Sequence, residues 1–200
     1  NRNPPSNKKT TGLAYFDKIS LRLISTKIGD NIIGINAVTE VLRSDVLSRG
    51  PKIEEFEEAI GKVCKGAKAL AVNSATSALH LAYILADVNK SSLVWTSPIT
   101  FAATANTALQ LGAEIDFVDI NPESLNICPQ ILEDKLIKAK KVNRLPNVVT
   151  AVHFGGNPCD MDSIYFLSEK YGFKVIEDAS HAFGATYKGL PIGGDKRSAA

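Results

Sequence analysis

The sequence predicts an α/β protein with a mostly parallel sheet and flanking helices. From about residue 69 onward, short apolar runs typical of buried strands alternate with longer segments of helical periodicity. Strands joined by helical crossovers lie parallel in one sheet. Polar turns follow several of these strands, and α/β sheets bind their ligands at the carboxyl ends of their strands.

Length and composition are those of a soluble globular protein with one main domain. The 200 residues can bury a sizeable core, with 44% apolar and 22% charged residues. A net charge of +2 without a basic stripe gives no argument for nucleic acid, and no apolar run approaches membrane-spanning length. The cysteines Cys64, Cys128 and Cys159 lack zinc spacing, so we expect reduced thiols in a cytoplasmic protein.

The first part of the chain divides into an extension and two helices. Residues 1–30 begin with a polar, proline-containing run and are expected to form a disordered or extended N-terminal extension. Residues 31–200 are then expected to form one domain. Apolar residues recur at helical spacing from Ile32 to Leu42, and a second helix begins at Pro51, after a turn. Its acidic first turns suit the helix dipole.

The remaining residues alternate between strands and helices. Helices are expected after the turn at residues 73–77 and over residues 102–112, 131–139 and 161–171. Apolar runs predict strands at residues 69–72, 93–96, 115–118, 148–152 and 173–176.

The stretch Glu177–Ala182 follows the last predicted strand and contains two acids and a histidine among small residues. A carboxylate at this position opens toward the ligand crevice of an α/β sheet. The alternative is a surface turn in which Asp178 or Ser180 caps a following helix. These residues alone leave both interpretations open.

The turn Asn73–Ser77 also allows two interpretations. Free N–H groups at a helix N-terminus, with hydroxyl side chains beside them, can bind phosphate. Neither a P-loop nor a Rossmann fingerprint is present, and the turn taken alone favours a simple Ser/Thr cap.

Two aromatic side chains lie near the same predicted edge. Phe101 follows a strand and Pro98, so it could stack on a planar ligand, although by itself it is more typical of a core. His153 ends another strand before a glycine-rich loop, where a structural role is favoured over ligand binding. No second ligand has metal spacing to His153, and no serine-hydrolase motif is present.

Together these features fit one ligand. A phosphate turn, an aromatic ring and a carboxylate are predicted at the same edge of the sheet. This combination suits a flat, phosphorylated, cationic heteroaromatic compound, and pyridoxal 5′-phosphate meets that description. The carboxylate of Asp178 would pair with the pyridine nitrogen and keep it protonated, so that the ring can act as an electron sink.

Five segments of the chain stand out together, in this order: GPKIEEFEEAIGK, AVNSATSALHLA, TSPITFAATANTALQLGAEIDFVDI, VHFGGNPCDM and VIEDASHAFGATYKG. In sequence, order and spacing they resemble the DegT/DnrJ/EryC1/StrS family of pyridoxal-phosphate-dependent sugar aminotransferases. The similarity covers about residues 30 to 195 and is closest to the branch that aminates UDP-linked 4-keto-6-deoxy-N-acetylhexosamines.

The resemblance implies a fold-type I aminotransferase large domain that works in a homodimer with sites at the interface. It implies a nucleotide-linked keto-sugar as substrate, glutamate as amino donor and a role in cell-surface polysaccharide or amino-sugar biosynthesis. It also implies roles for six residues: phosphate binding by Ser74, Ala75 and Thr76, ring stacking by Phe101, a bond from Asp178 to the pyridine nitrogen, and proximity of His181 to the ring hydroxyl.

One departure from the family pattern concerns the Schiff-base lysine. In the family it lies on a segment that would follow Ala200, and neither Lys188 nor Lys196 has matching surroundings. We therefore expect the chain to be a C-terminally incomplete fragment that is inactive alone. Two alternatives stay open: the dehydratase branch of the family, in which histidine replaces the lysine, and a non-catalytic domain that keeps only a cofactor pocket.

Overall fold

A computed structural model of the protein describes residues 32–200. The predicted extension, residues 1–30, lies outside the described residues. The chain divides into two compact units, and the boundary between them in the sequence lies between Ile60 and Gly61. Each unit is described by itself.

The first unit contains the two predicted helices, α1 (Ile32–Leu42) and most of α2 (Pro51–Val63). Proline has no N–H to leave unpaired, so it is well placed at the first position of α2. Glu54 lies in the first turn of α2 and Lys62 in its last turn, which matches the helix dipole at both ends.

The second unit is built on a parallel sheet of four strands in the order β2-β1-β3-β4. All three pairings between neighbouring strands are parallel, as the alternating sequence predicted. The α/β fold class is therefore confirmed. The strands are β1 (Leu93–Thr96), β2 (Glu114–Phe117), β3 (Val148–Val152) and β4 (Lys174–Asp178).

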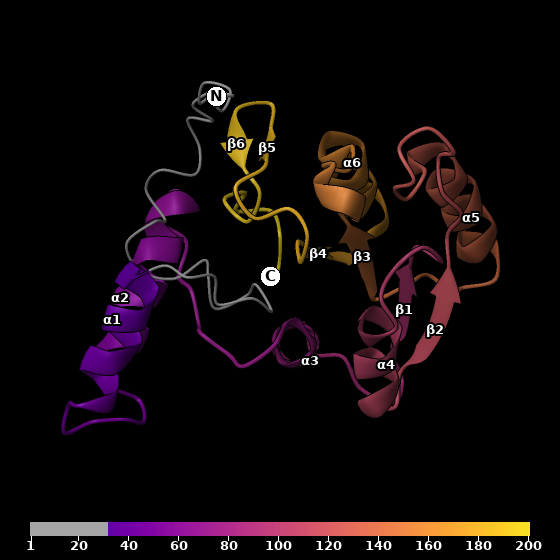
Figure 1. The fold of residues 1–200 in the computed structure, drawn as a ribbon. Coiled ribbons are helices and arrows are strands. Elements are labelled where there is room, and N and C mark those ends of the chain that lie inside the picture. Colours follow the sequence, from indigo (N-terminus) through magenta and orange to yellow (C-terminus); the bar gives the residue numbers. More distant parts are fainter. Residues whose placement is uncertain (1–31) are drawn as a thin grey trace, which may run out of the picture. The chain divides into compact units, whose positions relative to one another are not determined.

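Helices cover both faces of the sheet (Figure 1). One face packs against α3 (Ala75–Leu85) and α4 (Ala103–Gln110). The other face packs against α5 (Pro129–Lys141) and α6 (Met161–Tyr171). A short 3-10 helix, η2 (Phe154–Gly156), follows β3, and a hairpin of β5 (Thr186–Tyr187) and β6 (Leu190–Pro191) follows β4.

Successive residues of β4 point to opposite faces of the sheet. Val175 belongs to the core beneath α5 and α6, and Ile176 to the core beneath α3 and α4. The same alternation sends Glu177 toward the α6 face and Asp178 toward the α4 face. The two adjacent acids therefore lie in different environments.

The predicted strand at residues 69–72 is wrong. This segment has no regular structure, and the side chains of Leu70 and Val72 are exposed. A strand requires a neighbour for its backbone N–H and C=O groups, and among residues 32–200 no strand pairs with this run. Apolar character alone was not sufficient to define a strand here.

No helix within residues 32–200 is both long and apolar enough to cross a membrane. All three cysteines are buried as free thiols.

Candidate active site at the carboxyl edge of the sheet

Asp178 is a buried carboxylate at the carboxyl end of β4, with an exposed fraction of 6%. Its Oδ1 accepts hydrogen bonds from the Ser180 hydroxyl at 2.6 Å and the Ser180 N–H at 3.2 Å. Its Oδ2 accepts one from the Thr104 hydroxyl at 2.8 Å. Residues 180–184 form turns and the next element is β5 (Thr186–Tyr187), so the alternative in which Asp178 or Ser180 caps a following helix is wrong.

Thr104 and Thr100 connect this carboxylate to the loop that carries Phe101. The two threonine hydroxyls lie 2.7 Å apart. Since the single hydroxyl proton of Thr104 goes to Asp178, Thr100 must be the donor to Thr104. The N–H of Thr104 also donates to the Phe101 carbonyl at 3.0 Å. Thr100 lies before the start of α4 and Thr104 within it, and neither threonine has a local sequence signature that predicts this contact with Asp178.

Tyr83 connects α3 to Thr104 and to Thr150 of β3 through hydrogen bonds. Its fully buried hydroxyl lies 2.8 Å from both the Thr104 carbonyl and the Thr150 hydroxyl. Because a carbonyl can only accept, Tyr83 donates to Thr104 and accepts from Thr150. Burial raises the pKa of Tyr83 to about 12, a bond from Thr150 opposes the rise, and the negative charge of Asp178 adds to it. The phenol is therefore a stable donor at neutral pH.

Phe101 is 76% exposed, so the interpretation of Phe101 as a core residue is wrong. It lies in the loop between β1 and α4, two residues before the helix begins. The carbonyl of Phe101 accepts a hydrogen bond from the N–H of Thr104, the residue whose hydroxyl donates to Asp178. An exposed ring at this position is free to contact a ligand.

The predicted phosphate turn forms the N-terminus of α3. Ser74 is the N-cap in an extended conformation, and its hydroxyl accepts from the Ser77 N–H at 3.2 Å. The Ser77 hydroxyl donates to the Asn73 side chain at 2.7 Å. The predicted cap is therefore present. The N–H groups of Ala75 and Thr76 have no acceptor within the helix, as expected for a first turn.

His181 is exposed and lies beside the glycine-rich loop after β3. Its ring centroid is 6.4 Å from that of Phe154, in an edge-on arrangement. A Cβ atom at Gly156 would come within 2.8 Å of the His181 carbonyl, so this close approach requires glycine. No hydrogen bond joins His181 or the Ser74–Ser77 turn to Asp178 among the bonds found in residues 32–200.

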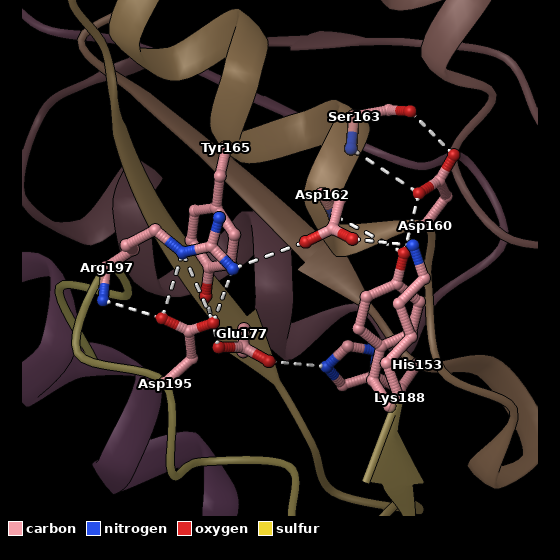
Figure 2. Close-up of polar contacts among 10 residues, drawn as sticks. His153, Asp160, Asp162, Ser163, Tyr165, Glu177, Lys188, Asp195 and Arg197 are labelled. Atoms are coloured by element: carbon pink, nitrogen blue, oxygen red, sulfur yellow. Dashed lines mark hydrogen bonds and ion pairs between the residues drawn. The ribbon is translucent and has the colours of Figure 1, made fainter. Parts of the chain in front are cut away.

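His153 and Glu177 form a separate, closed network on the α6 face (Figure 2). His153 Nε2 lies 3.0 Å from Glu177 Oε2, and His153 Nδ1 accepts from the Cys159 N–H. The proton of a neutral imidazole is therefore on Nε2, which donates to Glu177. The Tyr165 hydroxyl donates to the other oxygen of Glu177 at 2.8 Å. These contacts support the structural role expected for His153.

Tyr165 is held in this network by its surroundings. Burial and the nearby charge of Glu177 raise the pKa of its phenol, so it stays protonated and continues to donate. The Arg197 guanidinium lies 4.3 Å from the ring centroid and forms ion pairs with Asp195 and Asp162 (Figure 2). No set of three or more His, Cys, Asp or Glu side chains in the described part of the chain could hold a metal ion.

Lys188 does not lie with the Asp178 network. Its ammonium group is 2.6 Å from Asp162 of α6, which belongs to the opposite face of the sheet. The hydrogen bond to Asp162 raises the pKa of Lys188, so the amine is held in its charged, non-nucleophilic form. Lys196 is exposed in the loop that follows the hairpin.

Comparison with known proteins is decisive at this point. The profile of the DegT/DnrJ/EryC1/StrS aminotransferase family matches residues 30–200. The chain belongs to this family. Membership agrees with the resemblance found in the sequence.

Curated relatives of this DegT-family chain include a transaminase named for a UDP-linked amino sugar and a protein named for polysaccharide biosynthesis. A UDP-4-amino-4,6-dideoxy-N-acetyl-beta-L-altrosamine transaminase of Campylobacter jejuni is 44% identical over 159 residues, which are 80% of this chain and 41% of the relative. The spore coat polysaccharide biosynthesis protein SpsC of Bacillus subtilis is 43% identical, over 80% of this chain and 39% of SpsC. The chain thus spans about two fifths of the length of these relatives.

Solved structures agree with the fold. An aminotransferase from Psychrobacter cryohalolentis has a TM-score of 0.74 and 30% identity, over 84% of this chain and 42% of that chain. Helicobacter pylori PseC, an aminotransferase involved in the biosynthesis of pseudoaminic acid, has a TM-score of 0.69 and 31% identity, over 79% and 41% of the two chains.

Proposed function

We propose that this chain is the N-terminal part of a pyridoxal-phosphate-dependent aminotransferase that acts on a nucleotide-linked keto-sugar. The observation that carries the proposal is the buried carboxylate of Asp178, held by Thr104 and Ser180 beside the exposed Phe101. Membership of an aminotransferase family supports the reaction class. The length of the relatives supports the view that further residues complete the enzyme.

The donors and acceptors present fit pyridoxal 5′-phosphate. A carboxylate oxygen can accept two hydrogen bonds, and within residues 32–200 Oδ2 of Asp178 accepts only one, from Thr104. The remaining position suits a protonated ring nitrogen. The first turn of α3 offers the N–H groups of Ala75 and Thr76 and the Thr76 hydroxyl to a phosphate.

When bound, this cofactor supplies an electron sink for transferring an amino group. Asp178 would hold the proton of the ring nitrogen, because a paired negative charge favours the protonated form. Phe101 would cover one face of the ring and exclude water from it. Ser74, Ala75 and Thr76 would fix the phosphate, and His181 would lie near the ring hydroxyl.

Names of the relatives support a sugar as acceptor substrate. The transaminase from Campylobacter jejuni is named for a UDP-linked amino sugar, and SpsC for polysaccharide biosynthesis. Solved forms of Spr1654 from Streptococcus pneumoniae with PLP and with PMP, at 25–26% identity, support the cofactor. We further propose glutamate as amino donor, a homodimer, and a Schiff-base lysine outside residues 1–200.

The test is the Asp178→Asn variant of the full-length protein, with affinity for pyridoxamine 5′-phosphate and transamination as readouts. We expect a folded protein that has lost nearly all activity and binds this cofactor form more weakly. Asp119→Asn is the matched control, because Asp119 follows β2 and is exposed. Near-normal turnover in Asp178→Asn would contradict the assignment of Asp178 to the site and refute the proposal.

A further inference from the structure

We propose that Thr104 is a positioning residue for Asp178, and that Thr100 fixes the direction of the Thr104 proton. In this arrangement Thr104 orients the Asp178 carboxylate and leaves one defined acceptor position on Oδ2 for a protonated ring nitrogen. The inference rests on the proposed function and assigns a role to two hydroxyl groups that do not themselves contact the cofactor.

The number of hydrogen bonds around Asp178 gives the first argument. The two Ser180 donors fill both acceptor positions of Oδ1, at 2.6 and 3.2 Å. On Oδ2 the Thr104 hydroxyl fills one position at 2.8 Å, which leaves one. Without Thr104, two positions on Oδ2 would be equivalent and the carboxylate would lose one of three donors.

The direction of the hydroxyl protons gives the second argument. Thr100 donates to Thr104 and Thr104 donates to Asp178, so two O–H dipoles point in series at the carboxylate. Such chains polarise each other, and bonds to a charged acceptor are stronger than bonds between neutral groups. The series therefore strengthens the hydrogen bond by which Thr104 orients the Asp178 carboxylate.

Thr104 is itself held firmly. Its side chain is fully buried, and its carbonyl accepts from Tyr83 of α3. Its N–H donates to the Phe101 carbonyl, which fixes the residue at the start of α4. A hydroxyl on a backbone fixed at both its N–H and its carbonyl can orient a ligand-binding group precisely enough for a functional role.

A neighbouring threonine offers a matched control. Thr107 is also fully buried on α4, but its hydroxyl donates only to the Ala103 carbonyl of its own helix, at 2.8 Å. Thr104→Val and Thr107→Val remove the same atoms at the same depth from one helix. Only the first removes a donor from Asp178. Thr104→Ser retains the donor and tests rescue.

The experiment uses the full-length protein and pyridoxamine 5′-phosphate labelled with ¹⁵N in the ring. Thr104→Val is expected to weaken binding by up to about tenfold, which is about 1.4 kcal/mol, because the Thr104 bond is made to Asp178 and only its effect on the orientation of the carboxylate enters the affinity. The ¹⁵N shift of the bound ring should move toward that of neutral pyridine, because a carboxylate that is no longer held in position stabilises the protonated ring nitrogen less. Thr104→Ser and Thr107→Val should keep the wild-type ¹⁵N shift and most of the affinity.

Thr100→Val, which removes only the outer donor, should change the ¹⁵N shift in the same direction by less. If Thr104→Val retains the wild-type ¹⁵N shift and affinity while Asp178→Asn loses both, the inference about Thr104 is overturned and the proposed function stands. If Asp178→Asn also retains both, the proposed function fails with it. Equal loss in Thr104→Val and Thr107→Val would reduce Thr104 to a packing role and also overturn the inference.

Discussion

Replacement of Tyr83 by phenylalanine should destabilise the protein at neutral pH and remove part of its sensitivity to alkali. The change deletes one oxygen from a fully buried side chain. It leaves the Thr104 carbonyl and the Thr150 hydroxyl, each 2.8 Å from that oxygen, without this partner. A buried polar group that loses its partner costs about 1–3 kcal/mol, and that is the destabilisation we expect near neutral pH.

Raising the pH should destabilise the wild type relative to the phenylalanine variant. Burial raises the pKa of Tyr83 from the ordinary 10.0 to about 12. A raised pKa means that the folded state prefers the protonated phenol, so its stabilising contribution is complete below about pH 10 and is lost as the pH rises toward about 12. Two pKa units correspond to about 3 kcal/mol. The phenylalanine variant has no such contribution to lose.

Urea unfolding of wild type and Tyr83→Phe, as full-length proteins at about pH 8 and about pH 12, measures both effects. The wild type should be more stable at the lower pH, and the difference should vanish or reverse at the higher one. Other alkaline titrations affect both proteins alike. Tyr171→Phe, which keeps the ring that Lys140 and Lys170 contact, is the control. A difference between wild type and Tyr83→Phe that stays constant across this range would refute the reasoning.

Two further predictions concern the cofactor in the full-length protein. Thr76→Ala should weaken affinity for pyridoxamine 5′-phosphate by about ten- to a hundredfold, because one hydroxyl donor to a charged phosphate is lost; an unchanged titration would exclude Thr76 from the site. Reduction with borohydride in the presence of pyridoxal phosphate, followed by mass spectrometry, should label neither Lys188 nor Lys196 stoichiometrically, since Lys188 is held by Asp162 and no hydrogen bond within residues 32–200 joins Lys196 to Asp178. Specific labelling of either lysine would contradict the assignment.

Local patterns in the sequence predicted most of the fold. Strands β1, β3 and β4 were found because they are mostly buried runs rich in apolar residues, whereas the edge strand β2 is mostly exposed and was found from the short run at residues 115–118. The run at residues 69–72 has similar composition but no partner strand among the described residues. Pairing is a property of the whole sheet, so composition could not distinguish this run from the others.

The candidate site could be predicted only where its residues lie close together in the sequence. Asp178 and the Ser74–Ser77 turn stand out because strand ends and helix starts have local signatures. Thr104 does not, because its role depends on a contact with Asp178 that is separated by 74 residues. Phe101 was ambiguous for the same reason: an aromatic residue before an alanine-rich helix packs or protrudes according to what surrounds it, and here it is exposed.

The adjacent acids Glu177 and Asp178 face opposite sides of the sheet, and only Asp178 faces the candidate site. Glu177 faces α6, where its two oxygens accept from Tyr165 and His153, both neutral donors. The Glu177 side chain is 3% exposed, and its two hydrogen bonds hold the end of β4 against its neighbours. Asp178 faces α4, where hydroxyl donors fix it beside the loop of Phe101. A shift of β4 by one residue would exchange the two acids, and would point a carboxylate without its hydroxyl partners at the candidate site. The hydrogen bonds of Glu177 to His153 and Tyr165 therefore help to fix the register in which Asp178 faces α4.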